Sequence, residues 1–219
     1  MVQAVFIDYM GTTVDEHSPE MAEIVCRICK NNAVHDPGQV QRFILDTRRR
    51  YEADSYLDAY LTEDEIVDRL IGDMEAQIGL RDDPDALRGL IRRHWVNAPL
   101  FPDARAFFGQ CPAPIYIITN IGLPYMEQAL GQNGLKPAGV VSADTVRAYK
   151  PHREIFEGAL RLSGCAPAEA VHIGDSYDTD VMGARAAGIR PVLLLRGKAP
   201  RDGVESADSL TQALDLIFK

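Results

Sequence analysis

Short apolar runs, separated by helix-length segments, are the feature that most limits how this chain can fold. The runs cover residues 4–7, 115–118, 139–141, 171–173 and 191–195. Mainly apolar runs of this length are typical of strands covered on both faces, and helical patterns between the later runs indicate βαβ units. We therefore predict an α/β core built on a parallel sheet.

The helices of this core follow from glycines and from apolar periodicity. We expect them at residues 104–108, 124–131, 153–163, 180–187 and 210–218. Gly109 and Gly188 are expected to end two of them, because glycine tolerates the backbone that closes a helix.

A block of four amphipathic helical patterns interrupts the core directly after the first strand. Capping signals precede the four patterns at Ser18-Pro19, Asp36-Pro37, Thr62 and Asp83-Pro84. Apolar residues then recur at helical spacing, which predicts a small inserted helical bundle. The chain is therefore expected to divide into a core of residues 1–15 and 98–219 and a helical domain of residues 16–97.

Charge and composition narrow the class of partner. The formal net charge is −9, which argues against a nucleic-acid backbone or an anionic membrane surface. No apolar run approaches the roughly 20 residues of a transmembrane helix, and no signal-peptide pattern opens the sequence. Four scattered cysteines fit a reducing compartment. We expect a cytoplasmic protein that binds a small molecule; no pattern indicates an oligomeric state.

Polar residues follow several of the predicted strands. They are Asp8 after the first strand, Thr119 and Asn120 after the second, Lys150 in a later loop, and Asp175 and Asp180 after residues 171–173. The carboxyl ends of parallel strands meet at one edge of a sheet, so these side chains can converge. Each has an ordinary explanation by itself, but together they describe a site.

The residue types suit phosphoryl transfer. A carboxylate such as Asp8 can attack a phosphoryl group and form an aspartyl-phosphate. Mg²⁺ prefers oxygen ligands, which Asp8 and Asp175 would supply. Thr119 and Lys150 can bind phosphoryl oxygens through a hydroxyl, a backbone N–H and an ammonium group.

In this order, these residues resemble the haloacid dehalogenase (HAD) superfamily of hydrolases. The resemblance rests on Asp8-x-x-Gly-Thr-x-x-Asp15, Ile117-Ile118-Thr119-Asn120, Lys150-Pro151 and Gly174-Asp175-Ser176-x-x-x-Asp180. It implies a Rossmann-like core, and the helical insertion is similar to the cap of subfamily I members.

The resemblance also implies roles for the site residues. Asp8 would be the nucleophile and a metal ligand. The backbone carbonyl of Met10, together with Asp175 and Asp180, would complete an Mg²⁺ site, with Asp180 acting through water or orienting Lys150. Thr12 and Asn120 would lie near the phosphoryl oxygens that Thr119 and Lys150 bind.

Met10 departs from the pattern of the superfamily's phosphatases, in which an Asp at this position acts as general acid and base. A thioether cannot transfer a proton at neutral pH, and losing such a group costs roughly 10²–10⁴ in rate. Leaving groups of low pKa, such as acyl or aryl phosphates, would still depart. His17 is a candidate replacement acid, although a surface position at the hinge explains it more simply.

Three alternatives remain open. Residues 8–15 are similar to the first motif of phosphonoacetaldehyde hydrolases, which need a cap lysine for a Schiff base, and Lys30 is the only lysine in the expected cap. Haloacid dehalogenases also lack the second Asp, but they use no metal, whereas Gly174-Asp175-Ser176 favours Mg²⁺. A catalytically weakened, ligand-binding member is the third. We predict an Mg²⁺-dependent hydrolase that acts on a small phosphorylated metabolite through an aspartyl-phosphate.

Overall fold

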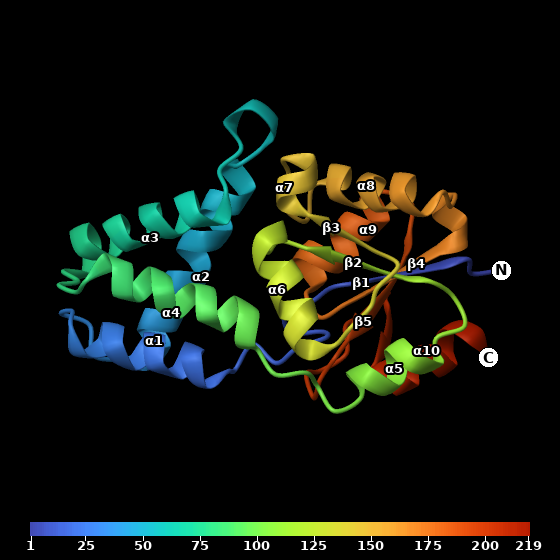
Figure 1. The fold of residues 1–219 in the computed structure, drawn as a ribbon, viewed down its shortest axis with the longest axis horizontal. Helices are drawn as coiled ribbons and strands as arrows, with labels where there is room; N and C mark the ends of the chain where they lie inside the picture. Colours follow the sequence, from blue (N-terminus) through green and yellow to red (C-terminus); the bar gives the residue numbers. More distant parts are fainter.

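One parallel sheet forms the centre of the molecule (Figure 1), in a computed structural model that describes residues 1–219. Its strands are β1 (Ala4–Ile7), β2 (Ile115–Thr119), β3 (Gly139–Ser142), β4 (Ala170–Gly174), β5 (Arg190–Leu194) and β6 (Glu205–Ala207). Their order is β3-β2-β1-β4-β5-β6, and every neighbouring pair is parallel. The predicted α/β, Rossmann-like architecture is confirmed.

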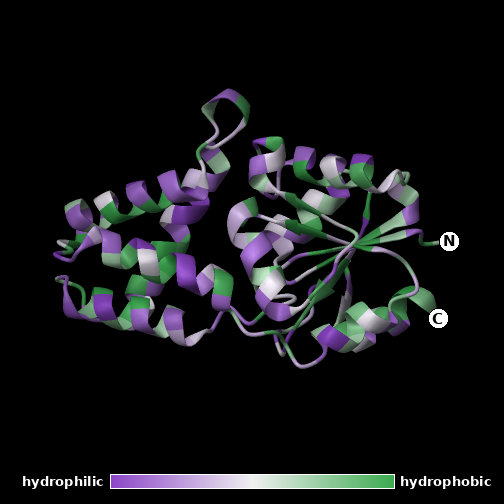
Figure 2. Cartoon of the chain, viewed as in Figure 1, coloured by the Kyte–Doolittle hydropathy of each residue, from purple (hydrophilic) through white to green (hydrophobic).

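Helices cover both faces of the sheet. They are α5 (Ala104–Gln110), α6 (Leu123–Asn133), α7 (Ala143–Val146), α8 (Arg153–Ser163), α9 (Met182–Ala186) and α10 (Leu210–Phe218). Successive side chains of a strand point to opposite faces. Val5 and Ile7 therefore join the buried cluster that includes residues of α5, α6 and α10, whereas Phe6 joins the cluster of α8 and α9. Figure 2 shows the hydrophobic strands between these layers.

Four further helices pack together beside the sheet, on the left of Figure 1. They are α1 (Pro19–Lys30), α2 (Pro37–Asp54), α3 (Glu63–Ile78) and α4 (Pro84–Asn97). The side chains of Ser18, Asp36, Thr62 and Asp83 accept hydrogen bonds from first-turn backbone N–H groups, as the sequence predicts. The four expected helices are confirmed. No helix in the chain combines the length and the apolar character needed to span a bilayer.

Two predicted helix ends are wrong. Helix α5 continues through Gly109 to Gln110, and α6 continues through Gly131 to Asn133. The residue that ends α6 is Gly134, whose φ of +64° is the left-handed conformation that closes a helix. Glycine inside a helix costs only about 1 kcal/mol relative to alanine, so packing on the sheet can carry a helix past it.

Three smaller elements differ from expectation. The segment predicted as one helix over residues 180–187 is a π-helical turn, Tyr177–Val181, followed by α9. Helix α7 and strand β6 were not predicted, because both are very short and β6 begins with the exposed Glu205. Their formation depends on neighbours that the sheet supplies.

The loop after α2 ties the helical bundle to the sheet domain. Tyr56 forms an isolated β-bridge with Ala148, and the backbone N–H of Leu57 donates to the Arg147 carbonyl at 2.9 Å. The Tyr149 hydroxyl donates to the Leu61 carbonyl, also at 2.9 Å. These contacts hold the bundle near the loops that follow the strands.

Candidate active site

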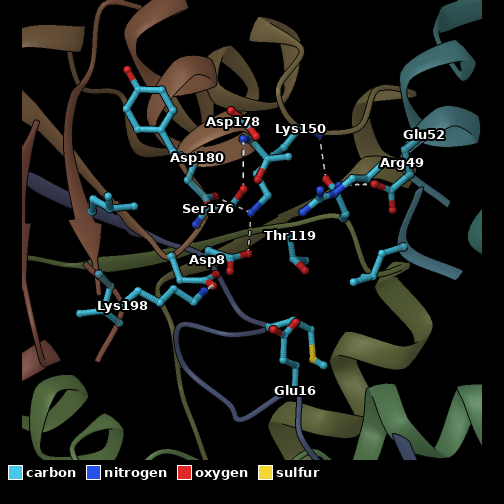
Figure 3. Close-up of a pocket in the computed structure, with 18 of the residues that line it drawn as sticks. Asp8, Glu16, Arg49, Glu52, Thr119, Lys150, Ser176, Asp178, Asp180 and Lys198 are labelled. Atoms are coloured by element: carbon cyan, nitrogen blue, oxygen red, sulfur yellow. Dashed lines mark hydrogen bonds and ion pairs between the residues drawn. The ribbon is translucent and has the colours of Figure 1, made fainter. Parts of the chain in front are cut away.

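A cavity of about 490 Å³ lies where β1, β2, β4 and β5 end, with α2 forming part of its wall. Its lining includes Asn120 and Asp175. It also includes Asp8, Thr119, Lys150 and Asp180, which are labelled in Figure 3. The structure therefore brings together six side chains that the sequence placed at separate strand ends. This is the edge at which parallel α/β sheets bind ligands.

Lys150 is the centre of the buried charges in this cavity. Its Nζ lies 2.5 Å from Oδ1 of Asp8 and 2.7 Å from Oδ1 of Asp180. The three side chains are between 2% and 7% exposed. Nε2 of His172, on β4, lies 3.0 Å from the same Asp180 oxygen. One ammonium thus bridges two buried carboxylates, and it is 142 residues from Asp8 in sequence.

The shared lysine leaves the two carboxylates with different pKa values. Burial raises the pKa of the Asp8 carboxyl to about 7, although the positive charge of Lys150 lowers it. The negative charges of Asp180 and Asp175 raise this pKa further. Burial also opposes ionisation of Asp180, but Lys150 and His172 outweigh it and hold the pKa of Asp180 well below its usual range. A bound cation would favour the ionised form of Asp8.

Three carboxylates converge closely enough to share a metal ion. Asp8, Asp175 and Asp180 each offer an oxygen, and these oxygens lie within 4.8 Å of one another. A Cβ added to Gly11, whose φ is +81°, would lie 2.7 Å from Oδ1 of Asp175; one added to Gly174 would lie 2.2 Å from Cγ of Asp180. The two glycines therefore permit this close approach. The all-oxygen, acidic donor set fits Mg²⁺.

Asp175 has two further neighbours. The Lys198 Nζ lies 2.7 Å from Asp175 Oδ2, and the Thr12 hydroxyl lies 3.4 Å from Oδ1. Thr12 is fully buried and is not among the residues that line the cavity. Its hydroxyl thus contacts a candidate metal ligand rather than the space a phosphoryl group would occupy.

Thr119 and Asn120 extend β2 into the cavity in different ways. The Thr119 hydroxyl accepts the backbone N–H of Ile121 at 3.1 Å, and Thr119 is buried. Asn120 Oδ1 accepts the backbone N–H of Lys150 at 2.8 Å. Asn120 therefore holds the backbone of the Lys150 loop beside β2.

A buried polar network joins α2 and α3 to the loop after β2, and sequence reasoning missed it. Arg48 donates to Glu52 at 2.7 Å and to Glu63 at 2.9 Å, and Glu63 accepts the Gly122 N–H at 2.8 Å. Burial raises the pKa of Glu63 to about 8. Glu63 looks like an ordinary acidic residue of a helix first turn, so no sequence signal marks its burial.

The remaining candidate residues are divided between this cavity and a second pocket. Met10 lines the cavity, whereas His17 and Lys30 line a separate pocket beside α1. His17 is exposed and contacts Asp15 at 3.1 Å. Sequence reasoning also missed Glu16, Lys198 and Arg201 as cavity residues, since they lie in loops without a recognisable motif.

Comparisons with known proteins identify the family of this chain. A family model described as haloacid dehalogenase-like hydrolase matches residues 2–188. Phosphoserine phosphatase from Thermus thermophilus is 36% identical over 126 residues, covering 55% of this chain and 50% of its own. Human glycerol-3-phosphate phosphatase is 30% identical over 138 residues, covering 52% and 43%. The chain thus spans about half the length of the curated relatives it matches.

Solved structures match over almost the whole chain. L-2-haloacid dehalogenase from Xanthobacter autotrophicus aligns with a TM-score of 0.78 at 18% identity, covering 99% of this chain and 98% of the other. The HAD-hydrolase YfnB from Bacillus subtilis, solved with magnesium, aligns with a TM-score of 0.81 at 18% identity and the same coverage. At this identity the likeness shows the fold, while the family match covers most of the chain. The chain belongs to the haloacid dehalogenase-like hydrolases.

Proposed function

We propose that this protein is an Mg²⁺-dependent phosphohydrolase that acts on a small phosphorylated metabolite through an aspartyl-phosphate on Asp8. The observation that carries the proposal is the buried arrangement in which Lys150 bridges Asp8 and Asp180, while Asp175 completes a cluster of three carboxylates. The proposed nucleophile, the Lys150 ammonium and the candidate metal ligands therefore lie together in one cavity of about 490 Å³.

Asp8 is the nucleophile of the proposed reaction. Lys150 holds its Oδ1, and no hydrogen bond engages Oδ2, which is left to attack phosphorus. Attack forms the new O–P bond and breaks the bond to the leaving group, which departs with the electron pair. Lys150 and the hydroxyl of Thr119 orient the phosphoryl oxygens.

Asp8, Asp175 and Asp180, with the carbonyl of Met10, would hold Mg²⁺. The bound ion supplies positive charge that offsets the repulsion between the Asp8 carboxylate and the substrate anion. In the second half of the reaction, water attacks the phosphorus of the aspartyl-phosphate. The Asp8 carboxylate is regenerated, and the protons of the water remain on the released phosphate and solvent.

Met10 sets the kinds of leaving group that this arrangement serves. Its side chain lines the cavity but can neither protonate a leaving group nor deprotonate water. We therefore expect good activity on acyl and aryl phosphates and poor activity on alkyl phosphates.

The names of similar proteins support a small phosphorylated substrate. They include a phosphoserine phosphatase and a glyceraldehyde 3-phosphate phosphatase. We infer that residues 16–97 act as a cap over the cavity, because α2 contributes to its wall. The phosphonoacetaldehyde alternative loses support from the position of Lys30, which lines a different pocket.

The test is steady-state hydrolysis of para-nitrophenyl phosphate, acetyl phosphate and an alkyl phosphate, with Mg²⁺ and with EDTA. We expect turnover that requires Mg²⁺ and is absent in Asp8→Asn. Met10→Asp should raise the rate on the alkyl phosphate by roughly 10²–10⁴ and change the aryl phosphate much less.

Folded-state controls make a negative result informative. Thermal melting of Asp8→Asn should show a cooperative transition, so that lost activity reports lost chemistry. If the wild type and Met10→Asp are both inert on every phosphate while both bind Mg²⁺ and melt cooperatively, the phosphohydrolase proposal fails.

A further inference from the structure

One face of α2 forms the wall of the cavity opposite the strand ends. Its members are Leu45, Arg48, Arg49 and Glu52. Their spacing of three or four residues places them on a single side of the helix. Helix α2 runs on to Asp54, so Arg48 and Arg49 lie more than a turn before its end, where they line the cavity.

The cations that line this cavity differ in whether they have a carboxylate partner. Arg48, Lys150 and Lys198 each form ion pairs with buried or half-buried acids. Arg201, in the loop after β5, lies over the ring of Tyr177 at 4.5 Å. Arg49 forms no ion pair and no hydrogen bond, so it is the uncompensated cation on the α2 wall.

Arg49 lines the same cavity as the proposed nucleophile. In Figure 3, Arg49 extends from α2 into the cavity that Asp8, Thr119 and Lys150 line. A phosphoryl group held at Asp8 would fill only a small part of a cavity of about 490 Å³. The cavity therefore has room for the rest of a substrate beside the wall that carries Arg49.

Arg48 cannot take the same role. Glu52 and Glu63 hold its guanidinium at 2.7 and 2.9 Å, and both acids are buried. Removing it from these partners would leave two buried acidic groups without their hydrogen-bond donor. This ion-pair network instead fixes α2, and with it the direction from which Arg49 enters the cavity.

We propose that the substrate carries a carboxylate as well as its phosphoryl group, and that Arg49 binds this carboxylate through two parallel hydrogen bonds. A planar guanidinium matches a carboxylate in this way, and its single charge balances a single negative charge. Arg49 is then a specificity-determining residue. The inference rests on the proposed phosphohydrolase function, since it assigns the part of the substrate that lies beyond the phosphoryl group.

The experiment compares 4-carboxyphenyl phosphate with 4-carbamoylphenyl phosphate. The two have nearly the same size and similar leaving groups, but only one carries the second charge. A bis-phosphate, 1,4-phenylene bisphosphate, tests whether a phosphate is preferred to a carboxylate. Each is assayed with the wild type, Arg49→Gln, Arg49→Lys and the control Arg50→Gln, whose side chain pairs with Asp73 outside the cavity.

We expect the wild type to favour the carboxylate over the amide by roughly 10- to 100-fold in kcat/KM, mainly through KM. Arg49→Gln should remove this preference, Arg49→Lys should restore part of it, and Arg50→Gln should retain it. Acetyl phosphate, which has no second anion, serves as the reference substrate: the ratio of kcat/KM for 4-carboxyphenyl phosphate to kcat/KM for acetyl phosphate should fall in Arg49→Gln. Equal losses on all substrates in Arg49→Gln, no preference in the wild type, or a stronger preference for the bisphosphate would overturn the inference.

Binding separates this inference from the proposed function. Isothermal titration of 4-carboxybenzylphosphonate and 4-carbamoylbenzylphosphonate measures the same preference without turnover. If no phosphate is hydrolysed but the carboxylate binds more tightly, and only when Arg49 is present, the phosphohydrolase proposal fails while the carboxylate site stands. If turnover occurs and the two phosphonates bind equally, the reverse holds.

Discussion

Replacing Lys150 with methionine tests the central electrostatic argument. Methionine keeps most of the volume of the lysine stem but removes the ammonium that bridges Asp8 and Asp180. Removing one partner of a buried ion pair costs about 3–5 kcal/mol, because an uncompensated charge stays buried. For a chain of this size, about 2–4 °C is lost per kcal/mol, so Tm should fall by about 6–20 °C.

Urea unfolding and thermal melting at pH 8 in EDTA measure this loss. At pH 5 the loss should be smaller, because the pKa of Asp8 is about 7 and its carboxyl takes up a proton there. Lys198→Met is the matched control. Lys198 is 59% exposed where it pairs with Asp175, so its loss should cost only about 0–1 kcal/mol.

Three results would refute the reasoning. Lys150→Met could unfold within about 1 kcal/mol of the wild type at pH 8, which is no more than the loss of an exposed pair costs. Lys198→Met could cost as much as Lys150→Met. The loss in Lys150→Met could also be the same at pH 5 and pH 8, which would contradict a contribution from ionised Asp8.

Further predictions concern close packing, pH and metal binding. Gly174→Ala places a Cβ 2.2 Å from Asp180 Cγ and should lower kcat/KM by about 10²-fold. The control is Gly72→Ala, whose Cβ would have no neighbour within 4 Å. It should leave activity unchanged and add up to about 1 kcal/mol to the free energy of unfolding. Equal activities would disprove the clash. Burial lowers the pKa of His94 to about 4, so the unfolded chain binds a proton that the folded chain does not. The free energy of unfolding should therefore fall, by up to about 3 kcal/mol, between about pH 6.5 and pH 4. Urea titrations of His94→Gln should show a shallower fall, and an unchanged slope would contradict this. Asp175→Asn should weaken Mg²⁺ binding by at least about tenfold in calorimetry; an unchanged Kd would exclude Asp175 as a ligand.

The candidate site was predictable in part because its residues follow strands. Asp8 and Asp175 come directly after apolar runs, and parallel strands bring such positions to one edge whatever their separation in sequence. Thr12 shows the limit of this reasoning: it follows Asp8 closely, but its side chain turns toward Asp175 and away from the cavity. Proximity in sequence does not specify side-chain direction after a turn.

The first and last residues of the helices were also predictable only in part. The starts of α1 to α4 were predictable, because a capping side chain satisfies backbone N–H groups only two or three residues away. The ends of α5 and α6 were not, since packing against the sheet extended both helices past glycines. Strand β6 has only three residues and is a strand because it pairs with β5.

The sequence by itself determined the alternation of strands and helices, the insertion of a helical block after the first strand, and the set of polar residues at the sheet edge. These depend on periodicity and capping, which act over a few residues. Only the tertiary structure decided that the Lys150 ammonium lies within 2.7 Å of both Asp8 and Asp180, that Arg48 is held by Glu52 and Glu63, and that Arg49 is left without a partner. Ion pairing depends on distances between atoms up to 142 residues apart in sequence, and folding alone sets those distances.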